Sequence, residues 1–159
     1  RHEPVDLASA VRRASASAEE RAAQAHIKIT TEIDPGQVVL ADPLALDVVL
    51  RNLLDNALAA VVPVGGGHIV FAARRAEAFV ELTVSDTGVG FRPADGVRLF
   101  EKFTRLQPGG GNYHGTGLGL YIVRRLMHLM GGSVSAESAG AGQGSRFVLV
   151  WPAAPAESA

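Results

Sequence analysis

The segment that begins at Asp42 constrains the fold most strongly, because it predicts a long helix directly before two strands. Asp42 is a typical N-cap residue, and Pro43 fits the first helical position. An apolar stripe with helical spacing follows, formed by Leu46, Leu50, Leu53, Ala57 and Val61. Pro63 and three glycines end this helix, and β-patterned runs follow at 69–73 and 79–85. The pattern predicts a helix followed by a β-hairpin.

The remaining patterns extend this unit into an α/β domain. Helices are also predicted at 6–25 and 118–130, and strands at 27–33, 38–40, 133–136 and 146–151. The stretch 86–117 is dense in glycine and predicts long loops with a short helical piece at 97–103. We expect a two-layer α/β sandwich, with a mixed sheet of about five strands and three main helices on one face.

The composition excludes several classes of function. The 159 residues are 47% hydrophobic, which is enough for one compact domain. The net charge of -1 gives no electrostatic attraction for nucleic acid or an anionic membrane. Cysteine is absent, and no apolar run approaches the roughly 20 residues that cross a bilayer. We expect a soluble domain at 1–152, cut from a longer protein, and a disordered tail at 153–159.

Two asparagines and an aspartate are the first candidates for binding chemistry. Asn52 and Asn56 lie four residues apart on the predicted helix, so both amides project from one face and need polar partners if they are buried. Asp86 ends a predicted strand, and Gly88 and Gly90 after it allow close approach of the backbone. The alternatives are that the asparagines cap loops or face solvent, and that Asp86 belongs to an ordinary turn.

Glycines and cations form a second group of candidates. Three alternating glycines in the segment 115–120 open a predicted helix, where backbone N–H groups and the helix dipole suit a phosphate. The segment has neither the spacing of a dinucleotide site nor the lysine of a P-loop, and close helix packing is the alternative. Phe100 and Phe103 can anchor a loop while Lys102 and Arg105 face a polyphosphate, unless these charges are simply solvated.

Taken in order, these four elements resemble the N, G1, F and G2 boxes of the histidine kinase catalytic domain. That domain belongs to the superfamily of gyrase, the Hsp90 chaperones and MutL, whose common structure is the Bergerat ATP-binding fold. The run 144–152 is similar to the terminal strand that closes the adenine pocket in this family. The resemblance extends over nearly the whole chain, from Pro4 to Pro152.

The resemblance implies ATP and Mg²⁺ as ligands and assigns a role to each candidate. Asn56 would hold magnesium, Asn52 would contact phosphate oxygens, and Asp86 would accept a hydrogen bond from the adenine amino group. Gly88 and Gly90 would flank the base. Thr116, Gly117, Leu118 and Gly119 would hold the phosphates. Lys102 or Arg105 would reach the γ-phosphate, and Ser145 would support the adenine end. Residues 104–114 would form a lid over ATP.

The reaction implied is transfer of the γ-phosphate from ATP to a histidine on a separate dimerisation domain, with a response regulator as an indirect partner. The histidines at 2, 26, 68, 114 and 128 are not in the sequence context of that phosphoacceptor. We expect a monomeric domain that is cytoplasmic, either alone or as the cytosolic part of a membrane-bound bacterial sensor. Hydrolysing relatives carry a glutamate where this chain has Asn52, and an amide is no general base at neutral pH.

Two positions depart from the family pattern and leave alternatives open. Ala59 and Ala60 replace a basic residue and an aromatic residue that many members carry after the magnesium asparagine. We therefore expect weaker nucleotide affinity. One alternative is a serine kinase of the anti-sigma-factor type, whose whole chain has about this size. Another is a degenerate module that binds nucleotide or a partner only for regulation.

Overall fold

The structure is a computed structural model that describes residues 2–101 and 119–154. Its helices are α1 (Leu7–Ala16), α2 (Glu19–Gln24), α3 (Pro43–Val61) and α4 (Gly119–Leu129), with 3-10 segments η1 (Val62–Val64) and η2 (Pro93–Phe100). Its strands are β1 (Glu3–Asp6), β2 (Ile27–Glu32), β3 (Val38–Ala41), β4 (Gly67–Ala76), β5 (Phe79–Asp86), β6 (Ser133–Glu137) and β7 (Ser145–Pro152). No helix within these ranges is long and apolar enough to span a membrane.

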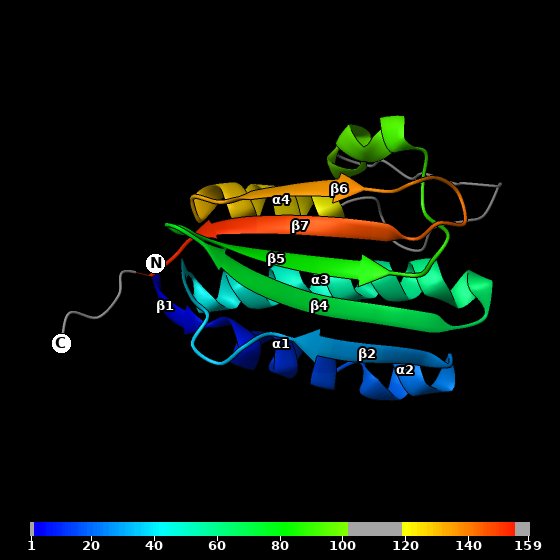
Figure 1. Cartoon of the computed structure of the whole chain (residues 1–159), viewed down its shortest axis with the longest axis horizontal. Helices are drawn as coiled ribbons and strands as arrows, with labels where there is room; N and C mark the ends of the chain where they lie inside the picture. The colour runs from blue at the N-terminus through cyan, green and yellow to red at the C-terminus, as the bar shows by residue number, and fades with distance from the viewer. Residues whose placement is uncertain (1, 102–118, 155–159) are drawn as a thin grey trace.

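The main sheet has five strands in the order β2-β4-β5-β7-β6, and a separate pair joins β1 and β3. β2 is parallel to β4, whereas the other neighbours are antiparallel. The α-helices lie behind this sheet in the view of Figure 1. The structure therefore confirms the predicted two-layer sandwich with a mixed sheet, and the predicted hairpin is β4–β5.

The core lies between α3 and the inner face of the sheet. All five residues of the predicted apolar stripe on α3 are at most 1% exposed. They face alternate residues of three strands, namely Ile69, Phe71, Val80, Leu82, Val84, Phe147, Leu149 and Trp151, which are at most 2% exposed. The Asp42 carboxylate accepts hydrogen bonds from the N–H groups of Leu44 (2.9 Å) and Ala45 (3.2 Å), which fixes the start of α3 as predicted.

The predicted helix 6–25 is two helices, so that prediction was wrong. α1 and α2 are separated at residues 17 and 18. The Ser17 hydroxyl donates to the carbonyl oxygen of Ala14 at 2.6 Å. Serine hydroxyls that bond backbone carbonyls compete with helical hydrogen bonding, which favours an end to the helix here.

The strands predicted at 27–33 and 38–40 both form, as β2 and β3, but they do not pair with each other. β3 pairs with β1, and Val39 lies opposite Val5 in that pair. β2 instead lies parallel to β4. A parallel pair needs a long crossover, which the connection through β3 and α3 supplies. α3 is thereby placed under the middle of the sheet.

Two boundaries also differ from the expectations. The short helical piece expected at 97–103 is η2, which starts four residues earlier, at Pro93. At the other end of the chain, Ala153 and Ala154 donate backbone hydrogen bonds to Ala78 (2.8 Å) and Val38 (3.1 Å). These two residues, which we placed in the tail, therefore continue the strand contacts.

Candidate functional site

The Asp86 carboxylate is the buried polar centre of the candidate site. Asp86 is the last residue of β5 and is 7% exposed. Its Oδ1 accepts a hydrogen bond from the Gly88 N–H at 2.8 Å, and its Oδ2 accepts one from the Ser145 hydroxyl at 2.7 Å. Ser145 begins β7 and lies opposite Asp86 in the sheet register. The structure thus brings Asp86, Gly88 and Ser145 together.

Burial raises the pKa of Asp86, while the hydrogen bonds from Ser145 and Gly88 act in the opposite direction. A carboxyl whose pKa is raised by folding stabilises the folded state below its unfolded pKa, which is about 3.9. That contribution is lost as the pH rises through the folded pKa. Ionised Asp86 therefore weakens the fold, so this chain retains a group that is better suited to binding than to stability.

This electrostatic cost gives a first testable expectation. Asp86→Asn removes the titrating group, so its thermal midpoint should rise relative to the wild-type midpoint as the pH is raised from about 4 to about 7. Calorimetry at several pH values in this range measures the difference. A difference that stays constant, or that falls with pH, would mean that burial does not raise the pKa of this carboxyl.

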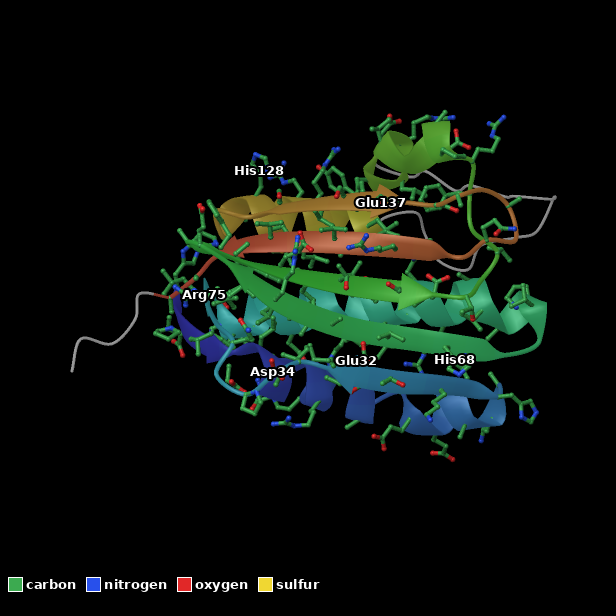
Figure 2. The ribbon with its side chains drawn as sticks, viewed as in Figure 1. Glu32, Asp34, His68, Arg75, His128 and Glu137 are labelled. Carbon is green, nitrogen blue, oxygen red and sulfur yellow. The ribbon has the colours of Figure 1, made fainter. Side chains whose placement is uncertain are left out.

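The turn after Asp86 is attached to two neighbouring elements. The Val89 N–H donates to the carbonyl oxygen of Ala60 at the end of α3 (2.9 Å). Thr87 exchanges hydrogen bonds with the backbone of His68, through its N–H at 3.2 Å and its hydroxyl at 2.9 Å. Figure 2 labels His68 and Glu137, which mark two sides of the sheet end where β5 stops. These attachments hold the backbone next to the carboxylate.

The same turn also contacts the loop between β6 and β7. The Gly142 N–H donates to the Val89 carbonyl at 2.7 Å, and the Gly144 N–H donates to the Gly88 carbonyl at 3.1 Å. A Cβ added at Gly88 would overlap the backbone of Ala60, and Gly90 has a φ of +64°. The glycines thus permit close approach of the backbone, as expected, but the groups that approach belong to the protein itself.

The two asparagines lie on α3, and both are half-buried. The Asn52 Nδ2 donates to the Val48 carbonyl at 2.8 Å, and a Cβ added at Gly119 would lie 3.0 Å from the Asn52 Oδ1. The start of α4 is therefore next to Asn52. Asn56 makes no hydrogen bond with the part of the chain that the structure describes.

The face of α3 links these two groups of residues. Asn52, Asn56 and Ala60 follow one another at intervals of four, so they lie along the same side of the helix. The first contacts the start of α4, and the last contacts the turn at Gly88. The arrangement can hold an elongated polar ligand between the end of β5 and the start of α4.

Five expected site residues lie outside the described residues, namely Lys102, Arg105, Thr116, Gly117 and Leu118, as does the expected lid at 104–114.

Comparison with known families identifies the class of domain that this fold and site define. Residues 41–155 match the family described as "Histidine kinase-, DNA gyrase B-, and HSP90-like ATPase". This match includes α3, the Asp86 turn and β7, and the chain belongs to this family.

Similar proteins within the family narrow the assignment. Sensor histidine kinase RcsC of Escherichia coli (strain K12) is 38% identical over 112 residues, which cover 70% of this chain and 11% of RcsC. Virulence sensor protein BvgS of Bordetella pertussis is 41% identical over 119 residues, covering 70% of this chain and 9% of BvgS. The chain thus spans about a tenth of the length of these relatives.

Solved structures agree with this narrower assignment. The mycobacterial sensor histidine kinase MprB superposes with a TM-score of 0.84 at 27% identity, covering 98% of this chain and 100% of that one. Full-length ShkA in complex with AMPPNP also gives 0.84, at 31% identity, with coverage of 99% and 32%. The chain is an ATP-binding catalytic domain of the sensor histidine kinase type. The expected family is confirmed, and the relatives do not favour the serine kinase or the degenerate module.

Proposed function

We propose that this domain binds ATP with Mg²⁺ along α3 and donates the γ-phosphate to a histidine on a separate dimerisation domain of the same kinase, which then phosphorylates a response regulator. The observation that carries this proposal is the buried Asp86 carboxylate at the end of β5, held by Ser145 and Gly88. The reaction places the domain in the cytosol, where ATP is available. We propose it as the cytosolic part of a longer sensor.

Recognition of adenine follows from the acceptors of Asp86. Each carboxylate oxygen accepts one hydrogen bond from the protein and retains capacity for another. The exocyclic amino group of adenine supplies the donor that such an oxygen needs. Guanine presents a carbonyl oxygen at the corresponding ring position, and this oxygen would be repelled by the carboxylate. We infer that the site selects adenine nucleotides.

Magnesium is assigned to Asn56 and to the phosphates of ATP, because Mg²⁺ takes hard oxygen ligands and is commonly held by few protein groups plus substrate phosphates. The Asn56 amide has no hydrogen-bond partner among the described residues and can turn its oxygen towards the ion. Bound magnesium would neutralise charge on the transferring phosphate.

Asn52, next to the start of α4, is proposed to position the phosphates. Lys102 and Arg105 are proposed to contact the γ-phosphate, with the backbone of 116–119 around the other phosphates.

Removing the proposed magnesium ligand should affect binding only when the metal is present. Asn56→Ala is expected to weaken ATP binding about tenfold in Mg²⁺, because one charge-assisted contact is lost. In EDTA its dissociation constant should match that of the wild type. Isothermal titration in both buffers measures this difference. Gln24→Ala, which removes an exposed amide from α2, is the control. Equal weakening in both buffers would exclude a metal-specific role for Asn56.

ATP hydrolysis by the isolated domain should be slow. Asn52 stands where hydrolysing relatives carry a glutamate, and an amide cannot take a proton from water at neutral pH. We expect phosphate release to stay near the background in a coupled assay. Rapid release that Asn52→Ala abolishes would instead place this chain with the gyrase-type ATPases.

The transfer step itself is tested by mixing. The purified domain is incubated with labelled ATP and the histidine-bearing dimerisation domain of its own kinase. Labelling of that histidine is expected, and Asn56→Ala should reduce it. Ala59 and Ala60 are the observation that favours a non-catalytic module. Binding of ATP without labelling of the histidine would support that second candidate.

A further inference from the structure

Ser138 follows β6 and occupies the point where three backbone segments meet. Its hydroxyl donates to the Gly144 carbonyl at 2.7 Å, with the Gly140 carbonyl 3.2 Å away. It accepts hydrogen bonds from the N–H groups of Phe91 at 3.1 Å and Gly140 at 3.2 Å. A hydroxyl has one donor and two acceptor sites, so the hydrogen-bonding capacity of Ser138 is fully used inside the protein.

These contacts fasten the loop between β6 and β7 to the turn that follows Asp86. Phe91 is the first residue after Gly90, and Gly144 directly precedes Ser145. The hydroxyl of Ser138 therefore links Phe91, at the end of the turn, to Gly144, the residue before Ser145. Ser145 in turn donates to Asp86 Oδ2 at 2.7 Å. Ser138 thus adds a side-chain link between the turn after Asp86 and the start of β7, beside the strand register and the backbone hydrogen bonds.

Apart from Ser138, the loop is held by two backbone hydrogen bonds to the turn, from the N–H groups of Gly142 (2.7 Å) and Gly144 (3.1 Å). Gly142 and Gly144 have φ values of +79° and +71°, and glycine loses the most conformational freedom on ordering. The attachments of the turn to α3 and β4 come from regular elements, whereas the loop 138–144 connects two strands without a helix or strand of its own. Its position depends on the hydrogen bonds to Ser138 and to the turn.

We infer that Ser138 is a positioning residue for base recognition: it holds Ser145 and the turn at 86–90 so that the Asp86 carboxylate is oriented to select adenine over guanine. This inference rests on the proposed function, because it assumes that Asp86 contacts the base. Ser138 touches neither ATP nor the reacting atoms in this proposal and acts through Ser145 and Asp86.

The test compares Ser138→Ala with Ser135→Ala, the same change at an exposed position of β6. Dissociation constants for AMPPNP and for the guanine analogue GMPPNP are measured below the thermal midpoints of all variants. Ser138→Ala should weaken AMPPNP binding about tenfold and change GMPPNP binding less than about twofold, since only the adenine contact depends on Asp86. Ser135→Ala should leave both values unchanged. Ser138→Thr, which keeps the hydroxyl, should keep the wild-type ratio of the two constants.

A double-mutant cycle separates positioning from a general loss of stability. In the Asp86→Asn background, Ser138→Ala should weaken AMPPNP binding by less than about twofold, because the group through which it acts is gone. A tenfold loss in that background, an equal loss for both nucleotides, or a lost ratio in Ser138→Thr would overturn the inference. If the wild-type chain itself does not prefer AMPPNP to GMPPNP, the proposed function fails instead, which is a different result.

Discussion

Asp86→Asn is expected to weaken ATP binding by about 100-fold while the domain stays folded. A hydrogen bond to a charged group contributes about 1.5–3 kcal/mol, and a donor that faces another donor adds a penalty for the unpaired group. The asparagine oxygen can still accept from the Gly88 N–H, and its amide can donate to the Ser145 oxygen. This orientation satisfies the protein but points an N–H group at the adenine amino group.

Two measurements on the same variant test this expectation. Titration with ATP and Mg²⁺ gives the dissociation constant, and calorimetry at neutral pH should give a thermal midpoint equal to or above that of the wild type. Asp55→Asn is the matched control, because it changes a carboxylate to an amide on α3 where the side chain is 60% exposed and pairs with Arg21. Native affinity in Asp86→Asn would remove Asp86 from base recognition. Loss of the fold would show that the carboxylate has a structural role.

The parts of the fold that the sequence predicted correctly depend on local patterns. The start of α3 follows from a capping side chain and a proline, and β4–β5 is a hairpin between consecutive runs. The incorrect parts depend on contacts between distant segments. β3 follows β2 closely in the sequence, but it pairs with β1. The chain then continues through α3 to β4, and β4 is the strand that lies parallel to β2. Strand propensity does not encode that choice.

The same distinction applies to the candidate site. The sequence indicated Asp86 and the asparagines because polar residues among apolar ones, at helical spacing or at a strand end, are visible in one dimension. It did not indicate Ser138, whose partners are backbone groups up to 47 residues away. The only local signal was the series of alternating glycines at 140, 142 and 144. Such a series predicts unusual backbone conformation without showing what the backbone approaches.

Substitutions at two of those glycines should separate the effect of steric overlap on stability from the effect of backbone strain. Gly142 and Gly144 both have positive φ, +79° and +71°, so alanine at either position should cost about 1–2 kcal/mol in free energy of unfolding. A Cβ at Gly142 would meet nothing within 4 Å, whereas a Cβ at Gly144 would overlap the carbonyl oxygen of Asp86. That overlap should lower the free energy of unfolding by a further amount of about 1–3 kcal/mol.

Gly144→Ala is therefore expected to lower the thermal midpoint by about 6–15 °C, and Gly142→Ala by less than about half as much, since about 1 kcal/mol corresponds to about 2–4 °C in a domain of this size. Only Gly144→Ala should also weaken ATP binding strongly, because the displaced Asp86 carbonyl moves the carboxylate on the same residue. Calorimetry and titration at a temperature where both variants are folded measure the two effects. If the two substitutions changed the thermal midpoint and the ATP affinity equally, backbone strain alone would account for both effects. The contact between Gly144 and Asp86 would then not hold the carboxylate in place.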